Sequence, residues 1–426
     1  MAPFAKSRHL PGLGVVLGWF ALVAGFSSLA LAGPYAGGSG TADDPYLIST
    51  AEELTLLGES PADWDKHFRL VNDIDLTGYS EKNLRMIGRW VALGSVQNQP
   101  FRGLFDGNGR TIHGFRYKDT QQEYVGLFQH VTGDVKNLRL SGAVVIGNKL
   151  GTGALVGYLE KGGVTGCSAV RVDVSGDYAV GGLVGAADGT VLTSGSSGKV
   201  SGARYVGGLV GQVGGGQVIR SCSGADVVGD ESVGGLIGGA LKETAIIDSC
   251  YALGTARGSA YVGGLVGQLV AGRVFRCYAA ARVTGPQWTG GLVGYQRTLG
   301  QVITCLWDTE ASTQATSVGG IGKTTAQMKS LDTYLALDWD FAGTWAMCDG
   351  RSYPILLWQI PLGDLRCPDG VNFIDFVWFA NNWRHDDCRE WNYLCDGADL
   401  DGSGAVEFRD LALFAAHWLA GVGGLE

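Results

Sequence analysis

The sequence predicts a mainly β fold, a parallel β-solenoid with caps at both ends, followed by a small α-helical domain. Three observations support this prediction. A glycine-rich motif of five residues recurs in tandem through the middle of the chain. The 426 residues include 70 glycines but only ten prolines. Near residue 361 the composition changes from glycine-rich to acidic and aromatic. A chain of this length exceeds one compact core, whereas stacked repeats let a single domain extend along one axis.

The first 32 residues are expected to be a cleaved export signal. Lys6 and Arg8 give it a basic start, an uncharged and mostly apolar stretch covers residues 15–31, and residues 30–32 read Ala-Leu-Ala. This order predicts cleavage before Gly33. The alternative is an uncleaved anchor, because the apolar stretch approaches membrane-spanning length. No later segment of the sequence is apolar for long enough to cross a bilayer, so we expect a secreted or cell-surface protein with no membrane span after cleavage.

The charge balance argues against one class of partner. Without the export signal the chain carries 30 basic and 41 acidic residues. A protein with this acidic excess is not expected to bind nucleic acid or an anionic membrane surface. The excess suits calcium and a solvated exterior, and we expect the protein to be a monomer.

Residues 33–122 are expected to form an N-terminal cap and the first solenoid coils. The segment Ser49–Glu52 reads Ser-Thr-Ala-Glu, which indicates a capping box at the start of a short helix. Two stretches, 68–76 and 101–112, then supply the first coils. A cap is needed because the edge and the core of the first coil would otherwise be open to water.

Residues 123–322 contain the repeat. Its pentads are Gly153–Gly157, Gly181–Gly185, Gly207–Gly211, Gly234–Gly238, Gly263–Gly267 and Gly290–Gly294. Their central leucines lie 28, 26, 27, 29 and 27 residues apart, and this spacing is typical of a solenoid coil. Only one proline, Pro286, occurs between residues 141 and 320, as continuous strand pairing requires.

A second column of small side chains follows the pentads. Its predicted members are Cys167, Ser194, Cys222, Cys250, Cys277 and Cys305. Three residues before each lies a β-branched residue: Val164, Val191, Ile219, Ile247, Val274 and Val302. The constant offset of three indicates a strand that stacks in register with its side chains facing inward, and the variable length before it indicates a turn.

The pentads resemble the core of the GLUG motif family, named for its recurrent Gly-Leu-x-Gly, which occurs in bacterial surface and secreted proteins. The resemblance covers residues 123–322. It implies an adhesin-like or protease-flanking region with no catalytic activity of its own.

Residues 323–360 are expected to form a C-terminal cap. Thr324 begins a helix expected to run to about Leu337, and a cluster of aromatic residues follows: Trp339, Phe341, Trp345, Tyr353 and Trp358. We interpret the cluster as packing on the last coil. A sugar-stacking platform is the alternative.

Residues 361–426 form a duplicated loop-helix unit in which two copies are offset by 35 residues, pairing Phe373 with Phe408 and Trp383 with Trp418. In the second copy the loop has oxygen ligands at positions 1, 3 and 5, glycine at 6 and a carboxylate at 12, the spacing of an EF-hand-type calcium site. The expected calcium ligands are Asp399, Asp401, Ser403 and Asp410 through their side chains, Ala405 through its carbonyl, and Glu407 directly or through water.

The first copy departs from this pattern. Asp364 occupies position 1, but Arg366 and Pro368 stand at positions 3 and 5, where neither side chain can serve as a ligand. We therefore expect the first loop to be free of metal or to bind it much more weakly.

The paired units resemble dockerins, the modules that attach bacterial extracellular proteins to cohesin partners. The resemblance covers about 55 residues and implies calcium-dependent docking onto a cohesin-like protein. Type I dockerins often carry hydroxyl residues at loop positions 10 and 11, whereas this chain has Phe408 and Arg409, so the identity of the partner stays open.

Cysteines outside the repeats leave their pairing open. Cys348, Cys367, Cys388 and Cys395 lie in or near the C-terminal module, and an exported protein can form disulfides. The five solenoid cysteines are expected to act as small buried apolar residues.

Two functional classes remain. In the first, the protein is a non-catalytic surface, scaffold or adhesin-like protein whose solenoid binds a partner such as a cell-surface polysaccharide. In the second, it is a polysaccharide-active β-helix enzyme that carries a dockerin. The carboxylates of such an enzyme would be Asp226, Asp230, Glu231 and Asp248, but these residues are explained equally well as acids exposed to water in turns.

The sequence was also compared with known catalytic motifs. Residues 317–324 resemble a phosphate-binding loop but lack its first glycine, and no HExxH or GxSxG motif occurs. We favour the first class and assign no catalytic residues.

Overall fold

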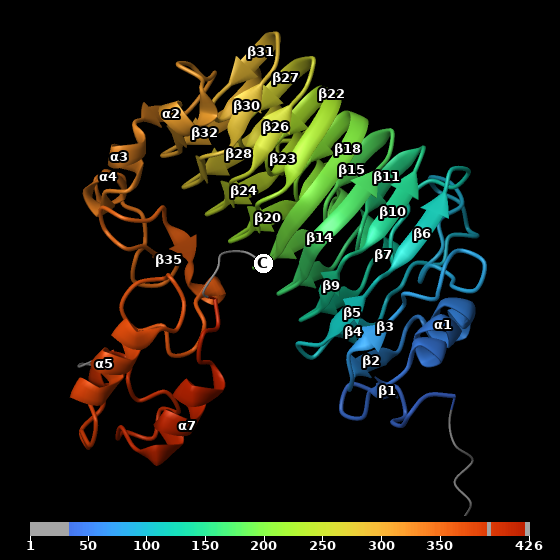
Figure 1. The fold of residues 1–426 in the computed structure, drawn as a ribbon. Coiled ribbons are helices and arrows are strands. Elements are labelled where there is room, and N and C mark those ends of the chain that lie inside the picture. The colour runs from blue at the N-terminus through green and yellow to red at the C-terminus, as the bar shows by residue number, and fades with distance from the viewer. Residues whose placement is uncertain (1–33, 390–392, 422–426) are drawn as a thin grey trace, which may run out of the picture.

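A computed structural model describes residues 34–389 and 393–421. The predicted export signal lies outside the described residues. The chain forms a parallel β-solenoid of about seven turns, with one helix, α1, at its N-terminal end and the other α-helices beyond its last coils (Figure 1). Two large sheets of 15 and 19 strands run along the solenoid, and their strand pairs are parallel. The predicted mainly β solenoid is confirmed.

The N-terminal segment begins the stack. Its elements are β1 (Tyr46–Ile48), α1 (Ala51–Glu59), η1 (Pro61–Asp63), β2 (His67–Leu70), β3 (Ile74–Asp75), β4 (Leu104–Asp106), β5 (Thr111–His113) and β6 (Arg116–Asp119). The capping box of α1 lies one residue later than predicted. The Thr50 hydroxyl accepts a hydrogen bond from Glu53 N at 3.3 Å, and the Glu53 carboxylate accepts one from Thr50 N at 3.2 Å.

The repeats supply the coils. Their strands are β7 (Phe128–Val131), β8 (Asp134–Lys136), β9 (Arg139–Ser141), β10 (Val144–Gly147), β11 (Leu150–Gly153), β12 (Val156–Leu159), β13 (Gly163–Thr165), β14 (Ser168–Ser175), β15 (Tyr178–Gly181), β16 (Val184–Ala187), β17 (Thr190–Leu192), β18 (Gly195–Gly207), β19 (Val210–Val213), β20 (Gln217–Ile219), β21 (Cys222–Ser223) and β22 (Asp226–Gly234). The later coils contain β23 (Ile237–Ala240), β24 (Ile246–Asp248), β25 (Tyr251–Ala252), β26 (Thr255–Arg257), β27 (Ala260–Gly263), β28 (Val266–Phe275), β29 (Tyr278–Ala279), β30 (Arg282–Thr284), β31 (Gln287–Gly290), β32 (Val293–Ile303) and β33 (Leu306–Asp308).

The pentads stack in register because their apolar residues share one core. Val156 pairs with Val184, which pairs with Val210, and the column continues through Ile237. These side chains are fully buried. The first pentad glycine has no room for a side chain, since a Cβ on Gly181 would lie 2.0 Å from the Val184 carbonyl oxygen.

The second inward column differs from the prediction in one coil. Val191 pairs with Val218, and Val218 pairs with Ile247, so Val218 rather than Ile219 faces the core. The residue three places later, Ser221, therefore takes the column position predicted for Cys222. Strand alternation causes this difference, because a shift of one residue turns every side chain to the opposite face.

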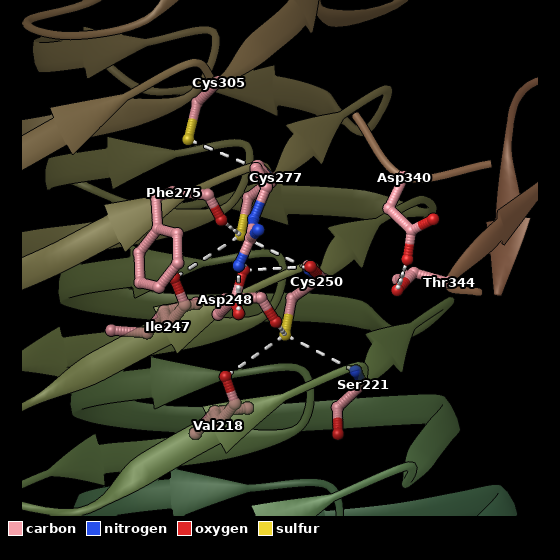
Figure 2. A network of polar contacts seen from close by, with 12 residues as sticks. Val218, Ser221, Ile247, Asp248, Cys250, Phe275, Cys277, Cys305, Asp340 and Thr344 are labelled. Carbon is pink, nitrogen blue, oxygen red and sulfur yellow. Dashed lines mark hydrogen bonds and ion pairs between the residues drawn. The ribbon is translucent and has the colours of Figure 1, made fainter. Parts of the chain in front are cut away.

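Hydrogen bonds link this column from coil to coil (Figure 2). Ser221 N donates to Cys250 Sγ at 3.4 Å, Cys250 N to Cys277 Sγ at 3.3 Å, and Cys277 N to Cys305 Sγ at 3.4 Å. Ser194 N donates in the same way to the Ser221 hydroxyl at 3.1 Å. Each side chain thus satisfies the backbone N–H of the preceding coil, and burial raises the pKa of the Cys277 and Cys305 thiols.

The segment after the repeats forms short elements instead of one helix. These are α2 (Thr309–Ser312), β34 (Ile321–Lys323), α3 (Thr325–Met328), α4 (Leu331–Leu335), β35 (Trp345–Ala346), β36 (Ile355–Leu356) and η2 (Leu357–Gln359). The helix predicted for residues 324–337 is broken, because α3 ends at Met328 and Ser330 is the N-cap of α4.

The aromatic cluster packs along the side of several coils and not only on the last one. Tyr278 donates through its hydroxyl to Pro354 O at 2.6 Å, and Trp358 Nε1 donates to Arg220 O at 2.8 Å, three coils before the end of the stack. Trp339 and Trp345 are 3% and 1% exposed. These two rings therefore serve packing, and their faces are not open for sugar stacking.

The C-terminal module contains α5 (Phe373–Asn381), α6 (Tyr393–Asp396) and α7 (Phe408–Ala416). The rings of Phe379 and Phe414 stack with their centroids 5.2 Å apart and join α5 to α7. Two disulfides resolve the pairing that the sequence left open. Cys348 pairs with Cys367, which ties the module to the preceding segment, and Cys388 pairs with Cys395. Across the described residues, every helix is too short or too polar to span a bilayer.

Candidate calcium-binding loops

The loop before α7 gathers three of the predicted ligands. Oxygen atoms of Asp399, Asp401 and Asp410 all lie within 4.8 Å of one another. The three carboxylates come from loop positions 1, 3 and 12, so the loop has folded back on the first turn of α7. This convergence requires close approach of like charges, which costs free energy unless a cation or hydrogen-bond donors compensate.

Asp410 anchors the loop from α7. Its side chain is fully buried. Its Oδ1 accepts hydrogen bonds from Leu400 N at 2.7 Å and Asp401 N at 3.0 Å, and its Oδ2 accepts one from Glu407 N at 2.8 Å. These donors fix the carboxylate in place. Oδ1 already accepts two hydrogen bonds, whereas Oδ2 accepts one and keeps a further lone pair for a ligand bond.

Asp399 closes the loop from its other end. This residue is 3% exposed. Its Oδ1 accepts a hydrogen bond from Ser403 N at 3.0 Å and its Oδ2 accepts one from Gly404 N at 2.9 Å. Gly404 has a φ of 95°, in the left-handed region that favours glycine, and this explains why glycine stands at position 6.

Asp401 has the least satisfied carboxylate. Hydrogen bonding by Ser403, through its side chain and its backbone N–H, lowers the pKa of Asp401. The Oδ2 atom is buried and accepts no hydrogen bond from the described residues. Arg409 Nε lies 3.3 Å from it, at the distance of an ion pair, although the Arg409 side chain is 77% exposed. A buried carboxylate oxygen with one exposed partner is suited to a cation that enters the loop.

The other predicted ligands stand at the edge of this group. The Ser403 hydroxyl lies 3.2 Å from Ala405 O, so these two oxygen atoms are neighbours. Glu407 is exposed, and its carboxylate is not among the three that converge.

The first loop has the same scaffold. Asp375 Oδ1 accepts hydrogen bonds from Leu365 N at 2.8 Å and Arg366 N at 3.1 Å, which repeats the pattern of Asp410. The Arg366 guanidinium lies over the Trp378 ring, 4.0 Å from its centroid, and does not act as a loop ligand.

One acidic residue of the first loop was missed from the sequence. Oxygen atoms of Asp364, Asp369 and Asp375 lie within 4.8 Å of one another. Asp369 stands at position 6, where the second loop has glycine. The spacing of an EF-hand-type loop places no ligand at this position, so the sequence did not predict Asp369 as one. Burial raises the pKa of Asp364 to about 6. Weaker metal binding by this loop stays a prediction.

The ligand atoms of the second loop are of the chemical type that calcium binds. Carboxylate, hydroxyl and carbonyl oxygens are the hard ligands that Ca²⁺ prefers, and no nitrogen or sulfur ligand lies in the group of three.

The solenoid acids proposed for an enzyme do not form a comparable group. Asp248 is held by Arg276, with Nη2 to Oδ2 at 2.7 Å and Nε to Oδ1 at 3.0 Å. Glu231 pairs with Arg204 at 3.1 Å, and Asp226 accepts a hydrogen bond from the Thr255 hydroxyl. In the described part of the chain, the close groups of three acidic residues are the two in the C-terminal module.

Comparison with known proteins gives partial likenesses. No protein-family model matches the chain. It is 33% identical over 170 residues to "Halomucin" of Haloquadratum walsbyi, and 40% identical over 131 residues to a "Putative Gly-rich membrane protein" of Evansella cellulosilytica. These alignments cover 39% and 29% of the chain but only 2% and 14% of the two relatives, so the chain spans a small part of either.

A solved structure shares the solenoid. The crystal structure of a "putative immunoglobulin A1 protease" from Bacteroides ovatus aligns with a TM-score of 0.51 at 21% identity, over 76% of this chain and 96% of that one. At this identity the likeness shows a common fold and carries no activity across.

Proposed function

We propose that the protein is an exported, non-catalytic surface or scaffold protein of adhesin-like type, in which the solenoid is a binding face and the C-terminal module attaches it to a partner in the presence of calcium. The observation that carries this proposal is the convergence of Asp399, Asp401 and Asp410 in one loop of a duplicated unit. The same unit is joined covalently to the segment that packs along the solenoid.

An extracytoplasmic location is supported by two kinds of observation. The described residues contain two disulfides, which persist in oxidising compartments. The names of the two relatives refer to a mucin and a membrane protein, which fits a location at or outside the cell surface. The export signal predicted for residues 1–32 agrees with both.

In this proposal Ca²⁺ binds to the carboxylates of Asp399, Asp401 and Asp410, with Ser403, Ala405 and Glu407 as further oxygen donors. Calcium supplies positive charge that offsets the repulsion among the converging carboxylates. The backbone donors on Asp399 and Asp410 hold these two side chains in position before the ion arrives. The ordered loop then fixes the start of α7.

The partner of the module is proposed from its resemblance to dockerins, and would be a cohesin-like protein. The GLUG assignment of the repeats likewise rests on their pentads. The exposed residues Phe373 and Phe408, 66% and 77% exposed, stand at equivalent places in the two copies and are suited to a contact with a partner.

The enzyme alternative has less support. A glycoside hydrolase needs a pair of carboxylates whose environments differ, whereas Asp248 and Glu231 are each paired with an arginine. The ion pairs explain these acids as parts of the solenoid surface.

The proposal is tested with the chain from residue 33 onward, because a fragment of the module alone, residues 361–426, would lose the Cys348–Cys367 disulfide. Labelled protein is added to cells of the producing organism that lack their own copy, and its retention is measured after washes with Ca²⁺ or with EDTA. We expect retention in Ca²⁺, release by EDTA, and loss of retention in the Asp399→Ala/Asp401→Ala variant. Retention that ignores both EDTA and the variant contradicts the proposal.

Catalysis is tested separately by reducing-sugar release from a panel of polysaccharides. We expect binding to a polysaccharide without release of new reducing ends. Steady release by the purified chain would favour the enzyme alternative.

A further inference from the structure

Two hollows at the N-terminal end of the solenoid share one residue of their walls, the buried Trp90. The loop of residues 88–100, between β3 and β4, is held by paired backbone hydrogen bonds between Arg89 and Gln99 of 2.6 and 2.9 Å. One hollow has a volume of about 700 Å³ and the other about 670 Å³, and Trp90 lines both. These volumes lie in the range of binding sites for small ligands or single sugar units.

Basic side chains line both hollows. Arg85, Arg89 and Lys149 line the first, and Arg102 and Lys161 line the second. All five residues are exposed. Within the described residues, none of the five has a carboxylate oxygen within 4.0 Å. Their charges are therefore available to a ligand.

The two acidic residues of these walls are already engaged. Glu123 Oε2 accepts a hydrogen bond from Trp90 Nε1 at 2.9 Å. Glu160 Oε2 lies 2.7 Å from Nε2 of His130, a residue that is 1% exposed. Burial lowers the pKa of His130, so the ring is a neutral donor at neutral pH. The walls of the two hollows therefore carry five basic residues and two acidic residues, and both acidic residues are already hydrogen-bonded. The chain as a whole, by contrast, has a net charge of −9.

The remaining walls mix amides with apolar surface. Gln121 and Gln122 are exposed at the first hollow and can exchange hydrogen bonds with hydroxyl groups. At the second hollow Leu93 and Val96 are 89% and 100% exposed, and the Tyr158 ring forms part of the wall. Amides for hydroxyls, apolar surface for ring carbons and cations for acidic groups together match the chemistry of an acidic sugar chain.

We propose that the two hollows form a binding cleft for an anionic polysaccharide, in which neighbouring hollows take neighbouring sugar units. The carboxylate or sulfate groups of the ligand meet the five cations. This inference rests on the proposed role of the solenoid as a binding face and names the class of ligand. The rest of the acidic surface repels a polyanion, so binding is confined to the cleft and weakens as salt screens the cations.

The test uses the chain from residue 33 onward in EDTA, so that calcium bridges and the C-terminal module play no part. Binding of polygalacturonate, dextran sulfate and neutral dextran is measured by calorimetric titration. We expect saturable binding of at least one polyanion, no binding of dextran, and a rise in Kd of about tenfold in each of the variants Arg85→Ala/Lys149→Ala and Arg102→Ala/Lys161→Ala. Polygalacturonate and dextran sulfate distinguish a carboxylate ligand from a sulfate ligand.

The matched control is Arg257→Ala/Arg282→Ala, which removes the same charge from exposed positions on later coils. We expect its Kd to stay within about twofold of the original. An equal loss in the control, equal binding of neutral dextran, or no binding of either polyanion would overturn the cleft. None of these outcomes alters calcium-dependent retention on cells, so failure of the cleft and failure of the attachment role are separate results.

Discussion

Replacing Val218 by asparagine tests the register of the solenoid core, with Ile219→Asn as the matched control. Val218 is fully buried between Val191 and Ile247, whereas its neighbour Ile219 is only partly buried on the other face of β20. Asparagine is chosen because Asp248 stands beside Ile219 in the ladder and would repel an introduced aspartate.

The expected difference follows from burial. Val218→Asn loses about 1.5 to 3 kcal/mol of apolar burial and leaves an amide in the core at a further cost of about 1 to 3 kcal/mol. The total of about 4 kcal/mol approaches the net stability of a small domain. Ile219→Asn keeps its side chain at the surface and is expected to cost about 1 kcal/mol.

The assay is urea unfolding followed by circular dichroism, together with amide hydrogen exchange of the coils. Hydrogen exchange is needed because repeat proteins can unfold locally and depart from two-state behaviour. We expect the Val218 variant to lose protection in β17, β20 and β24. An Ile219 variant that is as unstable as the Val218 variant, or less stable, would refute the register.

Three further predictions concern buried polar groups. Cys250→Ser is expected to cost about 1 kcal/mol or less, because Ser221 already fills an equivalent place, whereas Cys250→Val removes the acceptor for Ser221 N and is expected to cost about 1 to 3 kcal/mol more in urea unfolding. Native protein is expected to react with iodoacetamide at none of its five buried solenoid thiols, as mass spectrometry would show, and rapid labelling would mean that the coils open. The lowered pKa of His130 means that the folded protein binds its proton less readily than the unfolded chain does, so this stabilisation is complete above the ordinary value near 6.5 and is lost as the pH falls. The melting temperature should therefore drop between pH 7 and pH 5, and drop less in His130→Gln; equal pH profiles would contradict the role of the ring.

The repeat period allowed the solenoid to be predicted because each coil places the same residue types at the same point of the turn. The one wrong prediction in the inward column came from matching the type of residue, a cysteine, instead of its position in the strand. Cys222 matched the other cysteines, but Ser221 performs their task, since a hydroxyl and a thiol can both accept the N–H of the neighbouring coil. Cys222 faces the aromatic cluster around Tyr251 instead.

The sequence predicted only part of the structure of the C-terminal loops. The positions of Asp399, Asp401 and Asp410 follow from a local spacing, which a sequence shows directly. Asp369 was missed because it replaces a glycine of the pattern, and the partners in the two disulfides depend on contacts between segments that spacing does not define.

The cleft beside Trp90 gave no sequence signal. Its walls come from segments far apart in the chain, including the loop of residues 88–100, Glu123 and Lys161. The loop stands outside the repeat, so periodicity says nothing about where its side chains lie. Only the stacking of the coils brings these groups together.

Calorimetric titration of the chain from residue 33 onward with Ca²⁺, after removal of bound metal, tests the central claim most directly. We predict one strong site per chain, lost in Asp399→Ala/Asp401→Ala and little changed in Asp364→Ala, with a melting temperature that rises with Ca²⁺ as binding to the folded form requires. An absence of binding, or strong binding that survives the loss of Asp399 and Asp401, would contradict the account of the C-terminal module.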